Sequence, residues 1–304
     1  MTTSPEPNHK NNMRGAAWMI VAVVFFSATA IGVKTVGTSL NTFQIVFFRS
    51  LFGLIVVVPL LAIEGRKVLK FNRKELHILR VVLAVIGMSA GFYAITNLEL
   101  AMATSLSFTR PLFMIILAVL FLGETVRWRR GVATAIGFFG VLVMLRPGQI
   151  EFEFAFIASL ISALATAAAM ATIKAMAPTD SPVSIMVSFA IGTAFLTAIP
   201  ALFFWQTPTA LQLGWLIFVG IVSTTGQYCL IRAFFYGEAT VMNPIDYLQI
   251  LIATTAGFFL FSELPSLWTF AGAGVIVAAT LYILFREAKV QVDPDEPVIP
   301  PLKE

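Results

Sequence analysis

The chain has 304 residues, of which 58% are apolar or aromatic and only 12% are Asp, Glu, Lys or Arg, with a formal net charge of +4. Soluble domains carry about 25% charged residues, so this composition excludes an ordinary soluble enzyme, a disordered chain and a nucleic-acid-binding module. The stretch 181–231 contains no charged residue, which is enough for two membrane crossings of ~20 residues each. The composition therefore indicates a polytopic membrane protein.

Ten apolar runs follow one another along the chain, separated by Pro, Gly and charged residues. They cover residues 15–34, 41–63, 76–97, 100–122, 128–146, 153–175, 182–205, 211–236, 239–262 and 266–286. Each can cross a hydrocarbon core of ~30 Å as a helix that rises ~1.5 Å per residue, and none alternates like a barrel strand. The sequence thus predicts an all-α protein with ten transmembrane helices.

The flanks of these runs predict the orientation. If the N-terminus is cytoplasmic, sixteen of the twenty Lys and Arg residues fall on the cytoplasmic side, Arg80 among them, and only Lys34 and Arg146 fall outside. We therefore expect both termini in the cytoplasm, with residues 1–13 as an N-terminal tail and the acidic, Pro-rich residues 287–304 as a disordered C-terminal tail. Lys34 ends the first run, and we expect its ammonium group to reach water at the outer boundary.

The chain also repeats itself weakly. A shift of 139 residues places Glu99 on Glu238 and Glu124 on Glu263, and each of the latter two glutamates follows an apolar run and precedes a tryptophan. Five helices per half is an odd number, so the halves, 14–148 and 149–286, would insert with opposite topology. Inverted repeats are typical of secondary transporters, whose binding sites lie at the repeat interface near the midplane.

Two stretches resemble a known family. The run RPLFMIILAVLFLGETVRWRRGVATAIGFFGVLVMLRPG (110–148) is similar to the first-half signature of the drug/metabolite transporter superfamily, EamA type, and FLFSELPSLWTFAGAGVIVAAT (259–280) to its second-half counterpart. The resemblance covers residues 14–286. It implies two EamA-type five-helix repeats around a central cavity that works by alternating access without ATP. Similar sequences move amino acids, nucleotide-like molecules, vitamins, S-adenosylmethionine, organic cations and sugars.

Polar residues inside two of the predicted helices form matching stripes. Thr104, Ser107 and Arg110 lie on one helix face, and the shift of 139 superimposes them on Asn243, Asp246 and Gln249. Each stripe ends about ten residues into its helix, or ~15 Å, which is half of the hydrocarbon thickness. Polar groups at that depth must face the bundle interior or a wet cavity, so we expect the two stripes to meet near the midplane.

The remaining candidate residues extend this predicted site. Arg49 and Arg110 are cations inside apolar runs, and a guanidinium fork suits a carboxylate or phosphate of the solute, although pairing with Asp246 or Glu99 is the structural alternative. Asp246 is the one acid well inside a predicted helix, which makes it a candidate for proton coupling. Aromatic and polar groups expected in the cavity wall are Tyr93, Gln227 and Tyr228.

These patterns predict a secondary transporter of a small polar or amphipathic metabolite that carries a carboxylate or similar anion, such as an amino-acid-like solute. Uptake of a vitamin or nucleotide-like cofactor, of the riboflavin or S-adenosylmethionine class, is the alternative. An intramembrane enzyme is disfavoured, because both histidines, His9 and His77, are expected in polar connecting segments and a lone aspartate makes a poor catalytic set. We expect no catalytic residues, metal or cofactor. The expected partners are the solute and membrane lipids but no nucleic acid, with the chain a monomer or weak homodimer in the inner membrane.

Overall fold

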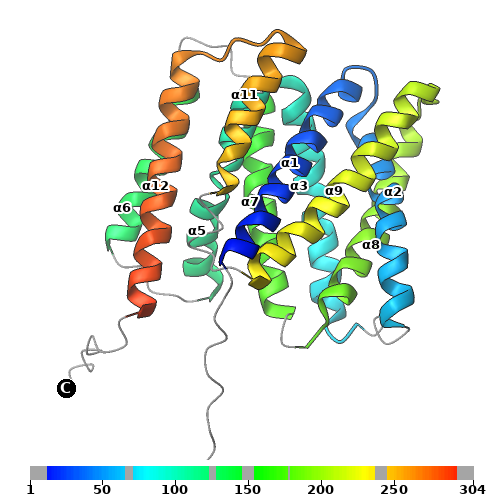
Figure 1. Ribbon diagram of the computed structural model, residues 1–304, viewed down its shortest axis with the longest axis horizontal. Helices are drawn as coiled ribbons and strands as arrows, with labels where there is room; N and C mark the ends of the chain where they lie inside the picture. Colours follow the sequence, from blue (N-terminus) through cyan, green and yellow to red (C-terminus); the bar gives the residue numbers. More distant parts are fainter. Residues whose placement is uncertain are drawn as a thin grey trace, which may run out of the picture.

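The computed structural model describes residues 12–65, 71–122, 128–145, 154–176, 179–236 and 245–292. Within these ranges the regular secondary structure is entirely helical. The helices are α1 (Asn12–Gly37), α2 (Thr42–Glu64), α3 (Lys74–Asn97), α4 (Leu100–Ser107), α5 (Arg110–Leu122), α6 (Trp128–Leu145), α7 (Phe154–Met176), α8 (Pro182–Phe203), α9 (Ala210–Tyr236), α11 (Leu248–Phe261) and α12 (Leu267–Val292). The long helices run side by side in a bundle (Figure 1).

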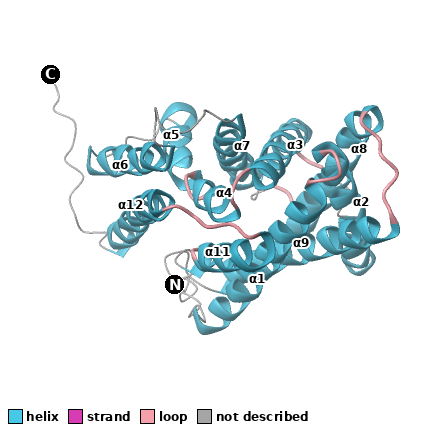
Figure 2. Cartoon of the chain, turned by 90° about the horizontal axis from the view of Figure 1, so that it is seen from above, coloured by secondary structure: helices cyan, strands magenta, loops and turns pink. Residues whose placement is uncertain are grey.

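Seen from above, the bundle has two rows of helices. Figure 2 shows α6, α5, α7, α3 and α8 along one side and α12, α11, α1, α9 and α2 along the other. The short helix α4 lies between the rows, where it contacts α7 in one and α11 and α12 in the other. The most extensive packing joins α1 to α9, α3 to α7, α6 to α12 and α2 to α8.

Membrane-spanning character is clear in the described part of the chain. Seven helical stretches there are long and apolar enough to cross a bilayer, and three apolar helices are shorter: Gly131–Val143, Leu248–Phe261 and Leu267–Tyr282. Large apolar side chains stand exposed on the outer helix faces, among them Phe195, Leu211 and Phe259. A bilayer removes the cost of that exposure, because lipid tails are as apolar as these side chains. The prediction of an all-helical polytopic membrane protein is confirmed.

Local sequence explains where several helices begin and end. The Asn41 side chain caps α2 by accepting a hydrogen bond from the Phe43 amide at 3.0 Å, and α2 ends at Gly65, whose φ of 73° favours glycine. Ser181 caps α8, and Pro182 occupies its first turn, where its missing N–H is not needed. At the other end of the chain, α12 continues to Val292. The predicted disorder therefore does not hold for 287–292, where Glu, Ala and Lys favour helix.

The continuous helix predicted over 100–122 is broken. α4 ends at Ser107, Phe108 and Thr109 form a turn, and α5 starts at Arg110. Pro111 explains the break, because its nitrogen carries no hydrogen to donate to the carbonyl four residues earlier, that of Ser107. The polar stripe Thr104, Ser107 and Arg110 therefore spans two helices rather than one helix face.

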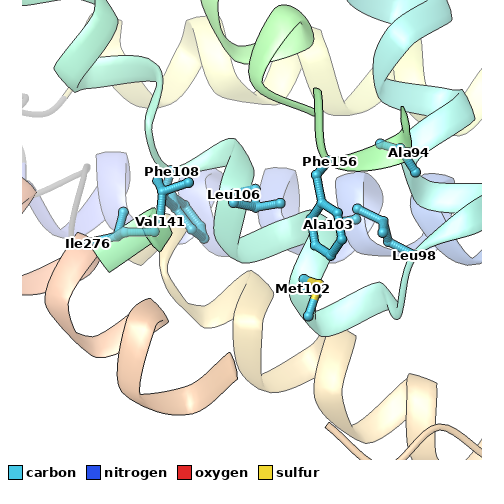
Figure 3. Packing of buried hydrophobic residues seen from close by; sticks show 10 residues of the cluster. Ala94, Leu98, Met102, Ala103, Leu106, Phe108, Val141, Phe156 and Ile276 are labelled. Atoms are coloured by element: carbon cyan, nitrogen blue, oxygen red, sulfur yellow. The ribbon is translucent and has the colours of Figure 1, made fainter. Parts of the chain in front are cut away.

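Buried apolar side chains around α4 hold this break in place. Figure 3 shows Leu98, Met102, Leu106 and Phe108 packed with side chains from three other helices, including Phe156 of α7, Val141 of α6 and Ile276 of α12. Leu106 is fully buried. Because α4 contributes to the core on several sides, its short length does not leave the following turn free to move.

A buried ion pair ties the start of the α11–α12 connection to α1. Lys34 in the last turn of α1 forms a salt bridge with Glu263 and donates a second hydrogen bond to the Leu98 carbonyl at 2.5 Å. The Glu263 carboxylate also accepts from the Leu100 amide at 2.8 Å. Burial and the neighbouring Glu263 raise the pKa of Glu99, and Lys34 opposes that rise. The prediction that Lys34 reaches water is wrong, because the ammonium finds a carboxylate inside the bundle.

We predict that Glu263→Gln destabilises the protein by about 3–5 kcal/mol, because it removes the salt-bridge partner of the buried Lys34 ammonium. Thermal unfolding of the purified protein in detergent measures the effect. Glu75→Gln, at an exposed position in the first turn of α3, is the matched control and should match wild type. The double variant Lys34→Met/Glu263→Leu should recover much of the loss. A Glu263→Gln protein as stable as wild type would contradict this role.

Candidate substrate-binding site

The break between α4 and α5 fixes the position of Arg110. Its Nε donates to the Ser107 carbonyl at 2.9 Å, which is the carbonyl that Pro111 leaves without a backbone donor. The Ser107 hydroxyl donates to the Thr104 carbonyl at 2.7 Å. The polar atoms released by the break are thus satisfied locally, and one edge of the guanidinium is held while the other stays available.

The available edge of Arg110 faces Asp246. Arg110 Nη2 lies 3.9 Å from Asp246 Oδ2, and Gln249 of α11 donates to the other carboxylate oxygen, Oδ1. The two side chains are 27% and 25% exposed, so the pair is neither sealed in the core nor fully solvated. A contact of 3.9 Å is long for a guanidinium–carboxylate hydrogen bond, for which about 2.7–2.9 Å is typical. Solute groups could therefore enter between the two charges.

Aromatic rings lie on both sides of this pair in the sequence and meet in space. Phe108 precedes the α5 start and Tyr247 follows Asp246, and their ring centroids are 4.6 Å apart. Tyr93 packs against the same apolar cluster and meets Phe154 edge-on at 5.7 Å. The structure therefore brings one end of each predicted stripe, together with Tyr93, to the same region. Phe108 was not predicted for the site, although its place beside the stripe and before Arg110–Pro111 could have signalled it.

Arg49 and Gln227 lie elsewhere, in a cavity of about 230 Å³ bounded by α2, α3, α7, α8 and α9. We call it the Phe189 chamber, after the aromatic ring that both of its arginines contact. Its polar lining residues are Arg49, Ser50, Arg80, Asp180, Thr224 and Gln227. Neither Arg110 nor Asp246 belongs to this lining. Arg80 was placed with the cytoplasmic charges, but the structure buries it to 6% exposure. Its position as the fifth residue of the predicted run 76–97 could have indicated that the side chain is buried.

One further predicted site residue, Tyr228, does not join the Arg110–Asp246 pair. The Tyr228 hydroxyl accepts a hydrogen bond from Arg232 Nη1 at 3.1 Å, and its ring meets Trp18 edge-on at 6.3 Å. Tyr228 therefore belongs to an aromatic group around Arg232. Asn243 lies outside the described residues, so its predicted place in the stripe stays a prediction.

Asp180 accepts several hydrogen bonds at the side of the Phe189 chamber near the start of α3. Its carboxylate accepts from the Asn72 amide at 2.9 Å and the Thr179 hydroxyl at 2.7 Å, and His77 Nε2 lies 3.3 Å away. Burial acts to raise the pKa of Asp180, but the hydrogen bonds from Asn72, Thr179 and His77 outweigh it and lower that pKa. Asp180 is thus a carboxylate at neutral pH whose oxygens are already occupied.

The arrangement at Arg110 and Asp246 is suited to binding charged groups. A guanidinium offers a planar fork to a carboxylate, and a carboxylate offers acceptors to an ammonium. The partly exposed ring of Tyr247, tilted by 49° against the buried ring of Phe108, offers an apolar surface next to Asp246. The fold defines a multi-pass membrane protein, and the candidate site brings a cation and an anion together inside its bundle.

Comparison with known proteins gives the family. The model of the EamA-like transporter family matches this chain twice, over residues 13–146 and 153–285. The chain belongs to that family, which is the one its sequence resembles.

Two similar proteins and one solved structure extend the comparison. The S-adenosylmethionine uptake transporter of Rickettsia felis is 35% identical over 92% of this chain and 95% of its own length. The riboflavin transporter of Brucella anthropi is 26% identical over 89% of this chain and 98% of its own. A solved crystal structure with 17% identity has a TM-score of 0.63 and covers 91% of this chain and 98% of that one, a likeness of fold alone. This protein is accordingly a transporter of small metabolites and not an enzyme.

We predict that Asp180→Asn lowers the melting temperature at neutral pH, and that the gap to wild type closes as the pH falls below about 4. The sign follows from the lowered pKa of Asp180: a carboxyl that is more acidic in the folded state contributes stability above its unfolded pKa and loses it in acid. Thermal unfolding in detergent between pH 3 and pH 8 measures the gap. A gap that stays constant over this range would show that the charge of Asp180 contributes nothing.

Proposed function

We propose that this protein takes up a solute of the S-adenosylmethionine class, whose amino-acid end binds between Arg110 and Asp246. The single observation that carries the proposal is this loose, partly exposed ion pair next to the Tyr247 ring. The similarity to S-adenosylmethionine uptake transporters over nearly the whole chain supports it. An amino-acid-like solute with a carboxylate, the function expected from the sequence, shares the same recognition chemistry.

Each group of such a solute has a matching partner in the site. The carboxylate would lie on the Arg110 fork, whose Nε is already fixed by the Ser107 carbonyl. The ammonium would lie on Asp246, which Gln249 orients. The sulfonium cation and the purine ring suit the faces of Tyr247 and Tyr93, since aromatic rings attract cations and stack on flat bases. Thr104 and Ser107 line the approach along α4.

A flavin fits this set of partners less well. Riboflavin has a large aromatic ring system and hydroxyl groups, but it has neither a carboxylate nor an ammonium to compensate Arg110 and Asp246. Opening this partly buried ion pair without replacing both partners costs free energy. The similarity to riboflavin transporters makes riboflavin the competitor to test against.

We further infer that the chain crosses the membrane ten times as two inverted repeats, 14–148 and 149–286, with both termini in the cytoplasm. The packing supports this inference: exchanging the two halves turns the α1–α9 contact into the α3–α7 contact and maps the α2–α8 and α6–α12 contacts onto themselves. The two rows of Figure 2 are related by the same exchange. Such a bundle would work by alternating access in a cytoplasmic membrane, surrounded by lipid, as a monomer or weak homodimer.

Uptake of radiolabelled S-adenosylmethionine into proteoliposomes tests the proposal. We expect saturable uptake that unlabelled S-adenosylmethionine inhibits and riboflavin does not. Arg110→Gln should lower kcat/KM at least about thirtyfold, corresponding to ~2 kcal/mol, because it leaves the solute carboxylate and Asp246 unpaired. Lys74→Gln, which removes an exposed cation from the start of α3, should transport like wild type.

Two results of this assay would contradict the proposal. Saturable uptake of riboflavin without uptake of S-adenosylmethionine would reject the solute class. Uptake of S-adenosylmethionine that is unchanged in Arg110→Gln would reject the site.

Proton coupling through Asp246 is a separate prediction. Asp246 is paired with Arg110 in this state and could take up a proton when the pair opens. An inwardly directed proton gradient imposed on the proteoliposomes should stimulate uptake by wild type, and Asp246→Asn should abolish the stimulation even where some uptake remains. Uptake with the same dependence on the gradient in both proteins would exclude Asp246 as the coupling group.

A further inference from the structure

The Phe189 chamber contains two buried cations that share one aromatic ring. Arg49 comes from α2 and Arg80 from α3, and they are 7% and 6% exposed. Their guanidinium carbons lie 5.5 Å and 5.0 Å from the centroid of the same ring, that of Phe189 in α8. Two like charges are thus held close together in a medium of low dielectric, where their repulsion is strong.

Close helix packing fixes Arg49 in this position. A Cβ atom at Gly220 would lie 2.5 Å from the Cβ of Phe52 and 3.1 Å from the Arg49 carbonyl, so only glycine allows α9 to approach α2 so closely. The approach places Ser223, one turn further along α9, against Arg49, whose Nε donates to its hydroxyl at 3.0 Å. Arg80 is fixed separately, since its Nη1 donates to the Ile185 carbonyl at 2.8 Å.

Most of the donors on these two arginines have no protein partner. A guanidinium carries five N–H donors. Beyond the bonds to Ser223 and Ile185, the described residues provide no further hydrogen bond to Arg49 or Arg80 and no carboxylate within 4.0 Å of either. Both side chains line the cavity, so their remaining donors are available to whatever occupies it.

Asp180 lines the same cavity but does not neutralise the arginines. Its two oxygens accept from Asn72 and Thr179, with His77 as the third neighbour. Two guanidinium groups and one carboxylate that is already engaged leave the chamber with an excess of positive charge. Buried charges are normally paired or hydrogen-bonded, so this excess indicates a missing anion.

We propose that the Phe189 chamber is a second binding site, which holds the carboxylate of a small organic acid between Arg49 and Arg80. Two planar forks match a carboxylate, and the Phe189 ring and the aliphatic lining match a short apolar body. The volume of about 230 Å³ lies below the ~300–1,000 Å³ typical of pockets for drug-sized ligands, so a whole nucleoside is too large. The carboxylate can belong to a separate acid or to the amino-acid end of the transported solute at another stage of its passage.

The site does not depend on the proposed function, because neither Arg110 nor Asp246 lines it. Binding of sodium benzoate and sodium isovalerate to the purified full-length protein, in detergent with matched sodium chloride, tests it by thermal shift and by titration calorimetry. The neutral isosteres benzamide and isovaleramide are the ligand controls. We expect the acids to raise the melting temperature with increasing concentration and the amides to have no effect.

Variants locate the binding. Arg80→Gln and Arg49→Gln should each weaken benzoate binding at least tenfold. Phe189→Trp keeps both cations and fills the chamber, so it should also abolish binding. Arg110→Gln should bind benzoate like wild type, which separates this proposal from the transport site. Any one of three results would overturn the proposal. The wild-type protein could fail to bind the acids, or it could bind acid and amide equally. Benzoate binding could also be unchanged in the Arg80→Gln and Phe189→Trp variants.

One further titration identifies the source of the carboxylate. If saturating benzoate weakens the binding of S-adenosylmethionine to wild type but not to Arg80→Gln, the chamber takes the carboxylate of the transported solute. If the two ligands bind independently, the chamber takes a separate organic acid.

Discussion

A bilayer provides no water to a charge inside a helical bundle, so every such charge must find a partner or create a site. This constraint organises the whole molecule. Lys34 forms a salt bridge with Glu263 and donates a hydrogen bond to the Leu98 carbonyl. These contacts join α1 to the α3–α4 and α11–α12 connections. Arg110 and Asp246 pair with each other only at 3.9 Å. Arg49 and Arg80 have no carboxylate within 4.0 Å among the described residues. The degree of compensation separates the structural pair from the two candidate sites.

Pro111 determines how the Arg110 side chain is oriented. Pro111 deprives the Ser107 carbonyl of its backbone donor, the helix breaks into α4 and α5, and the Arg110 side chain takes over the vacant acceptor. An unbroken helix would have satisfied the carbonyl within its own backbone and left Arg110 free to choose another rotamer. The apolar cluster around α4 then makes the break rigid. The proposed binding residue, Arg110, is therefore oriented by the same feature that interrupts the helix, and interrupted helices at the binding site are common in transporters.

Much of the fold could be predicted from the sequence, because long apolar runs with charged ends have few alternatives. The ends of α2, α7 and α8 fall within two residues of the predicted runs. The matching stripes led to Arg110 and Asp246, since a polar residue deep in a helix has to face the interior. Tertiary contacts were harder to foresee. Lys34 looked like a boundary lysine because nothing in its own segment reveals that Glu263, far along the chain, reaches it.

Arg80 and Phe189 show the same limit. A cation near the start of a predicted helix fits a cytoplasmic flank, and only the packing of α8 against α2 and α3 shows that Phe189 lies beneath two arginines. Arg49 was correctly singled out as a buried cation, but its separation from Arg110 depends on how the two rows of helices pack. Pairing partners between distant segments are therefore the part of the site that the sequence left open.

The central claim is that Arg110 holds the carboxylate of the solute. The most direct measurement compares the dissociation constants of S-adenosylmethionine and its decarboxylated analogue on wild type and on Arg110→Gln. If the claim is right, wild type binds the intact solute at least about tenfold more tightly than the analogue, a difference of ~1.4 kcal/mol, and Arg110→Gln binds the two alike. If the preference for the intact solute persists undiminished in Arg110→Gln, the carboxylate lies elsewhere and the claim is wrong.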